Sequence, residues 1–417
     1  MPNDMPAKSA VTDDPRLKAG IRFAEFIALM ALMTSMVALS IDMMLPALPA
    51  IGAEYGLAND NDRQLVIVVF SISLGISQFF FGPLADRFGR KPVAMASLAI
   101  YVAASLLASF APSFELLLIA RALQAVGASG VRITTMAIVR DCFEGREMAR
   151  VMSYIFTTFM IVPIVAPMVG QGILFITEWH AIFLFLTIGT GLLAVWAALR
   201  LKETLDPLHR RALSFVSFGR AAREIATTRV AAGYAIAIML FYSAMFSFIV
   251  SIQQVYDTIY GLGTWFAVAF AAHAVGMSVA SFLNGRLVRQ VGMRRMSHAA
   301  MLSYIGFTLV LFLWSRIETP PFWATFTLIS GALLSFVLIT GNFNSIAMQP
   351  LGHVAGTAAS LIGTLTYTVG AVLGGVVGAA FDGTIGPLSL ALVAFSGLAA
   401  LIVSYTERGR LFGDDQH

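Results

Sequence analysis

The chain consists largely of apolar runs about 20 residues long, separated by short polar breaks. A helix needs about 20 mainly apolar residues to cross the ~30 Å hydrocarbon layer of a bilayer. Only 12% of the 417 residues are charged, whereas about 25% is usual in soluble domains. The chain lacks the polar surface that a soluble fold of this size needs. It is therefore predicted to be an all-α integral membrane protein.

The apolar runs predict twelve transmembrane helices in two bundles of six. The expected helices are 23–48, 64–84, 92–111, 115–139, 148–175, 180–200, 231–256, 264–288, 296–315, 321–347, 355–380 and 385–405. The longest internal polar stretch divides them into equal sets. The predicted organisation is an N-terminal tail (1–22), a bundle (23–200), a central loop (201–230), a second bundle (231–405) and a C-terminal tail (406–417).

The placement of Lys and Arg predicts the orientation. If the N-terminus is cytoplasmic, 23 of the 27 basic residues fall in cytoplasmic segments. Only Arg63 and Arg316 fall on the opposite side, while Arg121 and Arg132 lie inside the fourth helix. This bias predicts that both tails and the central loop face the cytoplasm. It also accounts for the net charge of +4, so nucleic acid is not an expected partner.

Several function classes lack support in the sequence. The polar N-terminus is unlike a secretory signal peptide, because no short apolar region with a cleavage site follows it. The single cysteine, Cys142, excludes an intramolecular disulfide and a cysteine-pair redox centre. No metal-ligand cluster, HExxH run, paired catalytic carboxylates or P-loop is present. We therefore expect no metal, no cofactor and no enzyme; a membrane-embedded enzyme or sensor is the alternative of another class.

A few ionisable groups lie inside predicted spans, where an unpaired charge costs at least ~2.5 kcal/mol. Asp42 in the first helix and Arg121 in the fourth are both about 10 Å from the non-cytoplasmic end. We expect them to face a shared central cavity, where an acid near a fixed cation can exchange protons with water. The alternatives are a static salt bridge between helices, or an Asp42 that caps its helix or reaches outward.

Arg132 follows Arg121 by eleven residues, which is close to three helical turns. The two arginines share one stripe of the helix, flanked by Gln124 and Thr135, and this stripe should line the cavity. A structural contact near the cytoplasmic end is the alternative role for Arg132. His273, in the eighth helix, is either a proton carrier or a hydrogen-bonded packing residue.

Two helices carry unusual packing residues. In the fifth helix, Pro163 and Pro167 each remove a backbone donor and should bend the helix near Gly170. In the eleventh helix, four glycines offer a surface for close packing: Gly370, Gly374, Gly375 and Gly378. Both helices are candidate sliding surfaces between the bundles, and plain tight packing is the alternative for the eleventh helix. Tyr154 and Phe156 are candidates for lining an apolar substrate pocket.

The segment from Gly82 to Lys91 concentrates charge where the second helix leaves the membrane. Three of its residues recur 203 positions later: Gly82, Leu84 and Gly89 correspond to Gly285, Leu287 and Gly292, and Lys91 corresponds to Arg294. The offset maps the second helix onto the eighth. The two halves are therefore predicted to be parallel six-helix repeats, as in the major facilitator architecture.

These motifs resemble those of the major facilitator superfamily over about residues 20 to 405. The Gly82–Lys91 segment is similar to that family's loop between helices 2 and 3. Arg121-Ala-Leu-Gln124-Ala-Val-Gly127 is similar to its helix 4 motif, and Pro163–Gly170 resembles its antiporter motif.

Three further segments resemble the Bcr/CflA drug-resistance transporters. They are Asp42–Pro49, Ile138–Asp141 with Glu144-Gly-Arg146, and Leu351–Gly356. The resemblance implies proton-driven export of drug-like small molecules from the bacterial cytoplasm across the inner membrane. The implied partners are the substrate, protons and the lipid bilayer, with a monomer as the default state. A proton-coupled importer of a metabolite or siderophore is the alternative on the same fold.

The resemblance also implies roles for single residues. Asp42 would be the proton-coupling acid and Arg121 its regulator. A cytoplasmic gate would comprise Gly82, Asp86, Arg87, Gly89, Arg90, Lys91 and Asp141. In it Asp86 would meet the positive N-terminus of the eleventh helix near Gly356 and Thr357, and Arg90 would pair with Asp141. The second half has Arg289 where the first has Asp86, so it should lack an equivalent lock.

Overall fold

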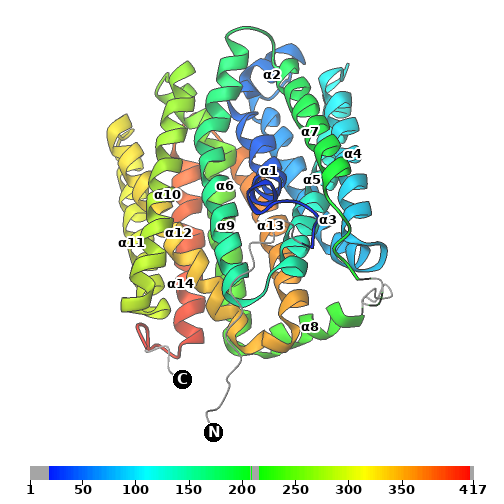
Figure 1. Cartoon of the computed structure of the whole chain (residues 1–417). Helices are drawn as coiled ribbons and strands as arrows, with labels where there is room; N and C mark the ends of the chain where they lie inside the picture. Colours follow the sequence, from blue (N-terminus) through cyan, green and yellow to red (C-terminus); the bar gives the residue numbers. More distant parts are fainter. Residues whose placement is uncertain (1–17, 207, 209–215, 414–417) are drawn as a thin grey trace.

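Twelve helices of 20 or more residues make up most of the computed structural model, which describes residues 18–206, 208 and 216–413 (Figure 1). They are α1 (Phe23–Asp42), α3 (Leu65–Phe88), α4 (Arg90–Ser109), α5 (Phe114–Cys142), α6 (Gly145–Leu174), α7 (His180–Arg200), α9 (Arg229–Gln254), α10 (Phe266–Val291), α11 (Met293–Ser315), α12 (Phe322–Met348), α13 (Ala355–Ala379) and α14 (Gly386–Thr406). Most of both predicted tails, and residues 207 and 209–215 of the predicted central loop, lie outside the described residues.

The helices are long and apolar enough to cross a membrane. Among the described residues, eleven continuous helical segments meet that requirement. One of them, Phe322–Ala379, has 58 residues and joins α12 to α13 through the short helix η6 (Gln349–Val354). Since about 20 residues suffice for one crossing, this segment crosses twice. The prediction of an all-α membrane fold with twelve spanning helices is confirmed.

The 203-residue repeat is visible in the backbone. Gly89 joins α3 to α4 with φ 104° and ψ 159°, and Gly292 joins α10 to α11 with φ 88° and ψ 151°. Such positive φ values are readily adopted only by glycine. In Figure 1, α10, α11, α12 and α14 stand on one side and α4, α5 and α7 on the other. We call the end that holds Gly89 and Gly292 the basic end, and the opposite end the far end.

The first predicted span, 23–48, lies within one helical segment, Phe23–Glu54, whose hydrogen-bond pattern changes partway. The helix α1 ends at Asp42, and after two intervening residues the short 3-10 helix η1 (Leu45–Ala47) leads into α2 (Leu48–Glu54). Pro46 has no N–H to donate to the carbonyl of Asp42, four residues earlier, so the α-helical ladder stops there. Asp42 thus lies where the α-helical hydrogen bonding of this segment is interrupted.

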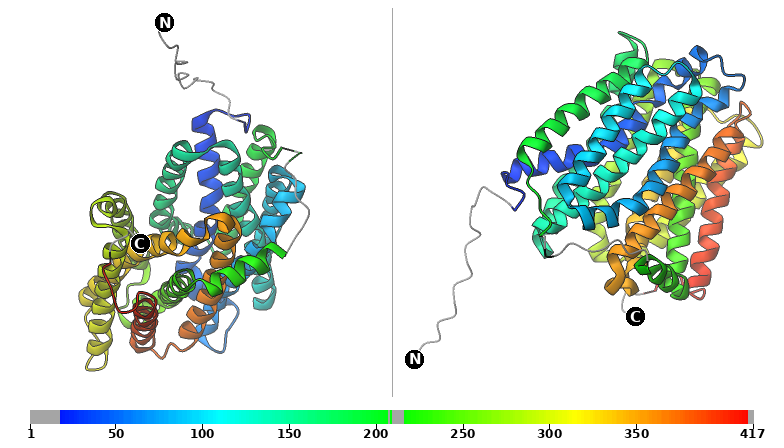
Figure 2. Two further views of the ribbon diagram at one scale, coloured as in Figure 1. Left: turned by 90° about the horizontal axis from the view of Figure 1, so that it is seen from below. Right: turned by 90° about the vertical axis from the view of Figure 1, so that its right-hand side faces the viewer.

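The predicted charged loop 82–91 is also corrected, because α3 continues to Phe88 with Pro83 inside it. Gly89 is the only residue between α3 and α4. The predicted central loop in turn contains a helix, α8 (Val216–Thr227), that sequence reasoning missed. It lies across the basic end beside α13 (Figure 2), where it packs on α13 and α9.

Candidate functional site

Arg121 ties three helices of the first half together. Its side chain is fully buried, and each guanidinium nitrogen donates one hydrogen bond. Nε donates to the carbonyl of Val66 in α3 at 3.0 Å, and Nη2 donates to the carbonyl of Ser40 in α1 at 3.0 Å. Nη1 donates to Oε1 of Gln124, one turn further along α5, at 2.5 Å. All three nitrogens of the cation therefore have a protein acceptor.

The polar network around Arg121 extends into α4. Gln124 is fully buried and donates from Nε2 to Oγ of Ser105 at 2.7 Å. The hydroxyls of Ser40 and Tyr101 lie 2.6 Å apart. The Phe70 ring centroid lies 4.3 Å from the Arg121 guanidinium carbon, which adds a cation–π contact. The network positions the end of α1 through its backbone.

Asp42 lies two residues after Ser40 and contacts Arg121 only indirectly. Its side chain is buried, with 6% of its surface exposed. Within the described part of the chain, its carboxylate has no ion pair within 4 Å and no hydrogen bond. Asp42 and Arg121 therefore do not form the static salt bridge that was one alternative for this pair. Arg121 is enclosed by protein, so it does not reach an open surface in this structure.

Arg132 makes a contact between the two halves. Its guanidinium carbon lies 4.7 Å from the ring centroid of Tyr367 in α13. The Tyr367 ring in turn lies 5.7 Å from both Tyr242 and Phe246 of α9. Nη1 of Arg132 is buried without a hydrogen-bond partner in the described structure. A cation from the first half thus faces an aromatic cluster of the second half.

One face of α13 carries hydroxyl groups with no partner. Ser360, Thr364 and Thr368 are four residues apart, so they lie on one face of the helix. Their hydroxyls are buried and unpartnered among the described residues, as is Nε2 of Gln78 in α3. The hydroxyl of Ser71 in α3, by contrast, bonds to the carbonyl four residues earlier. Three further buried hydroxyls off this face also lack a partner among the described residues: Ser129, Ser251 and Thr366. The seam between α3 and α13 therefore has unused hydrogen-bonding capacity.

Asn61, in the 3-10 helix η2 (Asp60–Gln64), links the halves at the far end. Its Nδ2 donates to the carbonyls of Ala379 at 3.1 Å and Phe381 at 2.8 Å, at the end of α13. Its Oδ1 accepts from Nε2 of Gln254 in α9 at 2.7 Å. In the loop after α13, the Thr384 hydroxyl donates a hydrogen bond to the carboxylate of Asp382, which lowers the pKa of Asp382. Sequence reasoning did not single out Asn61, because its partners are more than 190 residues away.

Further along the same seam, Gly75 of α3 meets the backbone of α13. A Cβ added to Gly75 would lie 2.7 Å from the backbone nitrogen of Thr368. The predicted close-packing glycines of α13 also lie in tight contacts. Gly374 meets Phe246 of α9, and Gly375 meets Val68 of α3. Side chains at these positions would push the helices apart, so the far-end part of the seam is closed.

The charged residues predicted for a gate gather at the basic end, within the first half. Nε of Arg90 lies 2.9 Å from Oδ2 of Asp141, and this pair was predicted. Nη1 of Arg90 lies 2.6 Å from Oδ1 of Asp86, one turn earlier. The predicted contact between Asp86 and the start of α13, near Gly356, is not formed in this structure, where Arg90 holds that carboxylate. Arg289 forms no ion pair among the described residues.

Glu203 completes the basic-end cluster and was missed by sequence reasoning. Its carboxylate accepts from the backbone N–H of Arg90 at 2.9 Å and of Lys91 at 3.1 Å. These are the first two donors of α4, which no residue within the helix can satisfy. A Cβ at Gly89 would collide with this carboxylate. The polar Lys-Glu-Thr run after α7 is visible in the sequence, but only the fold shows that its glutamate lies at the start of α4.

The remaining predicted site residues lie apart from these clusters. Lys91 donates to the carbonyl of Ala198 at 2.8 Å, and Arg87 is exposed beside Phe88. Gly82 has no neighbour within 4 Å of an added Cβ. Tyr154 and Phe156 are exposed on α6. His273 has both ring nitrogens hydrogen bonded, to Tyr256 at 2.7 Å and Ser330 at 2.9 Å, as in the packing alternative.

The two prolines of α6 do not interrupt it. The helix runs from Gly145 to Leu174 with Pro163 and Pro167 inside. Gly170 contacts the carbonyl of Met43, next to Asp42, so closely that a side chain would collide with it. The proline segment therefore packs against the break that follows α1.

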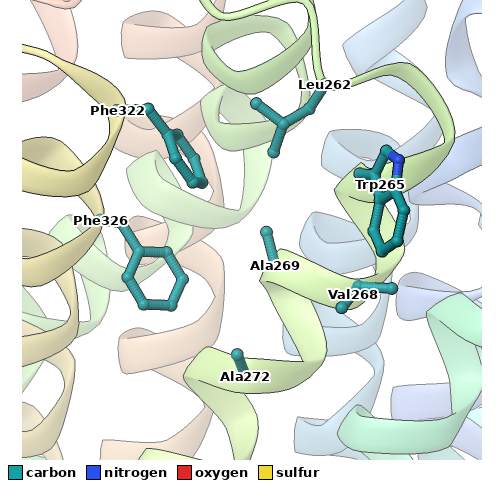
Figure 3. A pocket seen from close by; sticks show the side chains of 7 residues that line it. All are labelled: Leu262, Trp265, Val268, Ala269, Ala272, Phe322 and Phe326. Carbon is teal, nitrogen blue, oxygen red and sulfur yellow. The ribbon is translucent and has the colours of Figure 1, made fainter.

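Two grooves open on the outer face of the bundle. One, of about 340 Å³, lies between α10 and α12, where Leu262, Trp265 and Phe326 are among its walls (Figure 3). The other, of about 420 Å³, lies between α9 and α14. Neither groove contains a residue predicted for the substrate cavity.

Comparison with known proteins gives one family. Residues 30–375 match the family model described as Major Facilitator Superfamily. The uncharacterized MFS-type transporter YdgK of Bacillus subtilis is 31% identical over 82% of this chain and 85% of its own. A bicyclomycin resistance protein homolog of Haemophilus influenzae is 27% identical over 87% of this chain and 91% of its own. Among solved structures, a bacterial homolog of the human lysosomal transporter Spinster, 15% identical, covers 93% of this chain and 97% of its own with a TM-score of 0.72.

Proposed function

The chain belongs to the Major Facilitator Superfamily, and from this premise we propose that it exports drug-like small molecules in exchange for protons. The protein is a multi-pass membrane transporter. The relative from Haemophilus influenzae bears the name of a bicyclomycin resistance protein homolog. That name supports export of an antibiotic-like compound, and it favours this direction over import of a metabolite or siderophore.

The observation that carries proton coupling is the state of Asp42. Its carboxylate is buried at a helix break and has no fixed cation or donor among the described residues. Such a group can gain or lose a proton without first breaking an ion pair. Arg121, bonded to the carbonyl of Ser40, fixes the backbone that carries Asp42. Proton exchange at Asp42 would therefore act on the end of α1.

We assign the substrate path to the seam between the halves. Arg132, Tyr367 and Gln78, together with the free hydroxyls of α13, offer polar groups with unsatisfied bonding capacity. A ligand or water between the halves would satisfy them. Three other residues predicted for the same cavity have less structural support. Gln124 is hydrogen bonded to Arg121, and Tyr154 and Phe156 lie on the exposed face of α6.

Alternating access would use both ends of the seam. The Asn61 bonds and the Gly75 contact keep the far end closed in the present state. The cluster of Arg90, Asp86, Asp141 and Glu203 is confined to the first half here. We propose that Asp86 leaves Arg90 and meets the start of α13 when the basic end closes. Arg87 and Lys91 would add positive charge to that gate.

The proposed setting is the bacterial inner membrane, with the basic end in the cytoplasm. The distribution of Lys and Arg supports this orientation, because cytoplasmic loops carry an excess of these residues. Both tails and the segment between α7 and α9 would then be cytoplasmic. The two six-helix bundles, 23–200 and 231–405, would rock against each other, and a monomer would be sufficient.

The test has two steps. A strain that overproduces the protein should tolerate higher concentrations of bicyclomycin, or of another compound in an antibiotic panel, than the empty-vector strain. A compound identified in this way is then used in proteoliposomes that report internal pH. Wild-type protein should move protons against the substrate, and Asp42→Asn should transport without proton movement or not at all. Proton-coupled transport by Asp42→Asn would refute the role of Asp42. A deletion strain with unchanged susceptibility throughout would favour the importer.

A further inference from the structure

The groove between α9 and α14 is bounded by small and aliphatic side chains and opens away from the bundle. Its volume is about 420 Å³, within the usual range for ligand pockets. The walls include Ala232, Ile236, Leu401 and Ile402. Ile236 is 41% exposed and Leu401 is 69% exposed. In a membrane protein such an outward apolar groove faces the hydrocarbon chains of lipids.

Gly233 forms the floor of the groove and explains why it is there. The side chain of Thr406 in α14 occupies the space that a Cβ on Gly233 would need. The two helices therefore pack closely at this point, and the groove opens above it. The groove therefore lies between two tightly packed helices and does not result from loose packing of α9 against α14.

Arg229 lines the groove at the basic end, and Arg408 follows two residues after the lining residue Thr406. Arg229 donates from Nη2 to the carbonyl of Tyr405, and its guanidinium carbon lies 4.8 Å from the Tyr405 ring centroid. The backbone N–H of Arg408 donates to the same carbonyl at 3.2 Å. Both side chains are exposed, and neither has an ion pair within 4 Å among the described residues. The positive charge at this mouth is therefore not neutralised by the protein.

Glu407, the acid that precedes Arg408 in the chain, is directed elsewhere. Glu407 accepts hydrogen bonds from the Tyr234 hydroxyl at 2.7 Å and from Nε of Arg294 at 3.1 Å, on the inner side of α14. Only 15% of its side chain is exposed. Glu407 is thus already neutralised by Arg294 and leaves the mouth of the groove cationic.

We propose that this groove binds one acyl chain of an anionic phospholipid, with the phosphate between Arg229 and Arg408. The mouth lies where α9 begins and α14 ends, which is the level of the headgroups. Ile236 is seven residues further along α9, about 10 Å deeper by helix rise, within the hydrocarbon layer. An apolar groove below a pair of free cations matches the two parts of such a lipid.

The experiment measures lipid preference directly and needs no transport substrate. Delipidated protein in dodecyl maltoside is mixed with equal amounts of dioleoylphosphatidylglycerol and dioleoylphosphatidylcholine, and bound lipids are counted by native mass spectrometry. At low salt the wild type should prefer phosphatidylglycerol by about twenty-five-fold, since each of the two arginines near the headgroup contributes about fivefold. The preference should fall at 1 M salt, where the Debye length shrinks from ~10 to ~3 Å.

Variants distinguish lipid binding in the groove from nonspecific attraction of anionic lipids to the positive charge of the protein. Arg229→Gln with Arg408→Gln should reduce the preference to near unity, whereas Arg229→Lys with Arg408→Lys should keep most of it. Arg316→Gln, at the far end, is the matched control and should change nothing. Ala232→Trp leaves both arginines and fills the groove, so it should lower phosphatidylglycerol retention even if the double glutamine variant does not fold. An equal affinity of the wild type for both lipids, or a preference that survives the glutamine and tryptophan changes, would overturn the proposal.

Discussion

Nη2 of Arg121 lies 3.0 Å from the carbonyl oxygen of Ser40, two residues before the only carboxylate buried in α1. The same guanidinium donates to the carbonyl of Val66 in α3. Through these bonds one side chain of α5 fixes the backbone of two other helices. Asp42 is thereby held at a defined position without being paired itself.

Replacing Arg121 with Gln should destabilise the protein. Glutamine is too short to reach both carbonyls, so the carbonyl of Ser40 would lose the Arg121 bond at the end of α1, and that of Val66 would keep only its bond within α3. Hydrogen bonds to charged groups contribute about 1.5–3 kcal/mol each, so the loss should be at least about 3 kcal/mol. Thermal unfolding in detergent, followed with a dye that reacts with Cys142, would report it as a lower midpoint. Arg316→Gln should leave the midpoint unchanged. A wild-type midpoint for Arg121→Gln would contradict the structural role.

The helices were predictable from sequence because the membrane imposes one physical requirement on every span. About 20 apolar residues in a row can satisfy their backbone in hydrocarbon only as a helix. The same rule failed at the basic end of α3, which was predicted at residue 84 and lies at Phe88. Charged residues mark where a chain leaves the membrane, but Asp86 and Arg87 continue the helix in the aqueous layer. Only the positive φ of Gly89 ends it.

The clusters at the two ends of the seam were only partly predictable. Arg90 and Asp141 could be paired because both belong to motifs with a family resemblance. Glu203 and Asn61 could not be found in this way, because each acts on backbone groups far away in the chain: Asn61 bonds to the carbonyls of residues 318 and 320 positions later. Backbone N–H and carbonyl groups carry no sequence signal, so such contacts appear only once the fold is known.

Glu203 should stabilise the basic end by capping α4. Its carboxylate receives the N–H groups of Arg90 and Lys91 and also favours the positive end of the helix dipole. We expect Glu203→Ala to cost about 1–2 kcal/mol of unfolding free energy. Glu203→Gln, which keeps one oxygen acceptor, should lose about half of this. Urea unfolding in mixed micelles would measure the difference. Glu147→Ala, on the exposed first turn of α6, is the control; an equal loss in both alanine variants would argue against the cap.

Asn61 should bias the transporter toward closure at the far end. Asn61→Ala removes three hydrogen bonds to the second half, each worth about 0.5–1.5 kcal/mol. The ratio of open to closed far ends should therefore rise by about tenfold or more. Spin labels at Ala58 and Thr264, exposed at the far end in different halves, would report the distance distribution in a Cys142→Ser background.

The control for this measurement is Asp60→Ala, which changes a neighbouring exposed residue without removing a bond between the halves. It should keep the wild-type distance distribution. If Asn61→Ala and Asp60→Ala give the same distribution as the wild type, the Asn61 contacts do not determine which state is populated.

Arg132 and Tyr367 should be energetically coupled across the two halves. The guanidinium lies 4.7 Å from the ring centroid, and a partly desolvated cation–π contact contributes about 0.5–2 kcal/mol. Tyr367→Phe keeps the ring and should retain most of the coupling, whereas Tyr367→Leu should lose it. A double-mutant cycle with Arg132→Gln, measured on the unfolding midpoint, isolates the pair from the separate effects of each change.

The same cycle, measured on transport, separates a packing role from a role in the substrate path. If Arg132 only packs, KM should be unchanged in every variant that folds, including Arg132→Lys. If its unpartnered Nη1 receives a substrate acceptor, Arg132→Gln should raise KM about tenfold, because a charged hydrogen bond is worth about 1.5–3 kcal/mol, with little change in expression or midpoint. Tyr367→Phe should then keep a near-normal KM, since it leaves the cation in place. An additive cycle together with an unchanged KM would remove Arg132 from the proposed path.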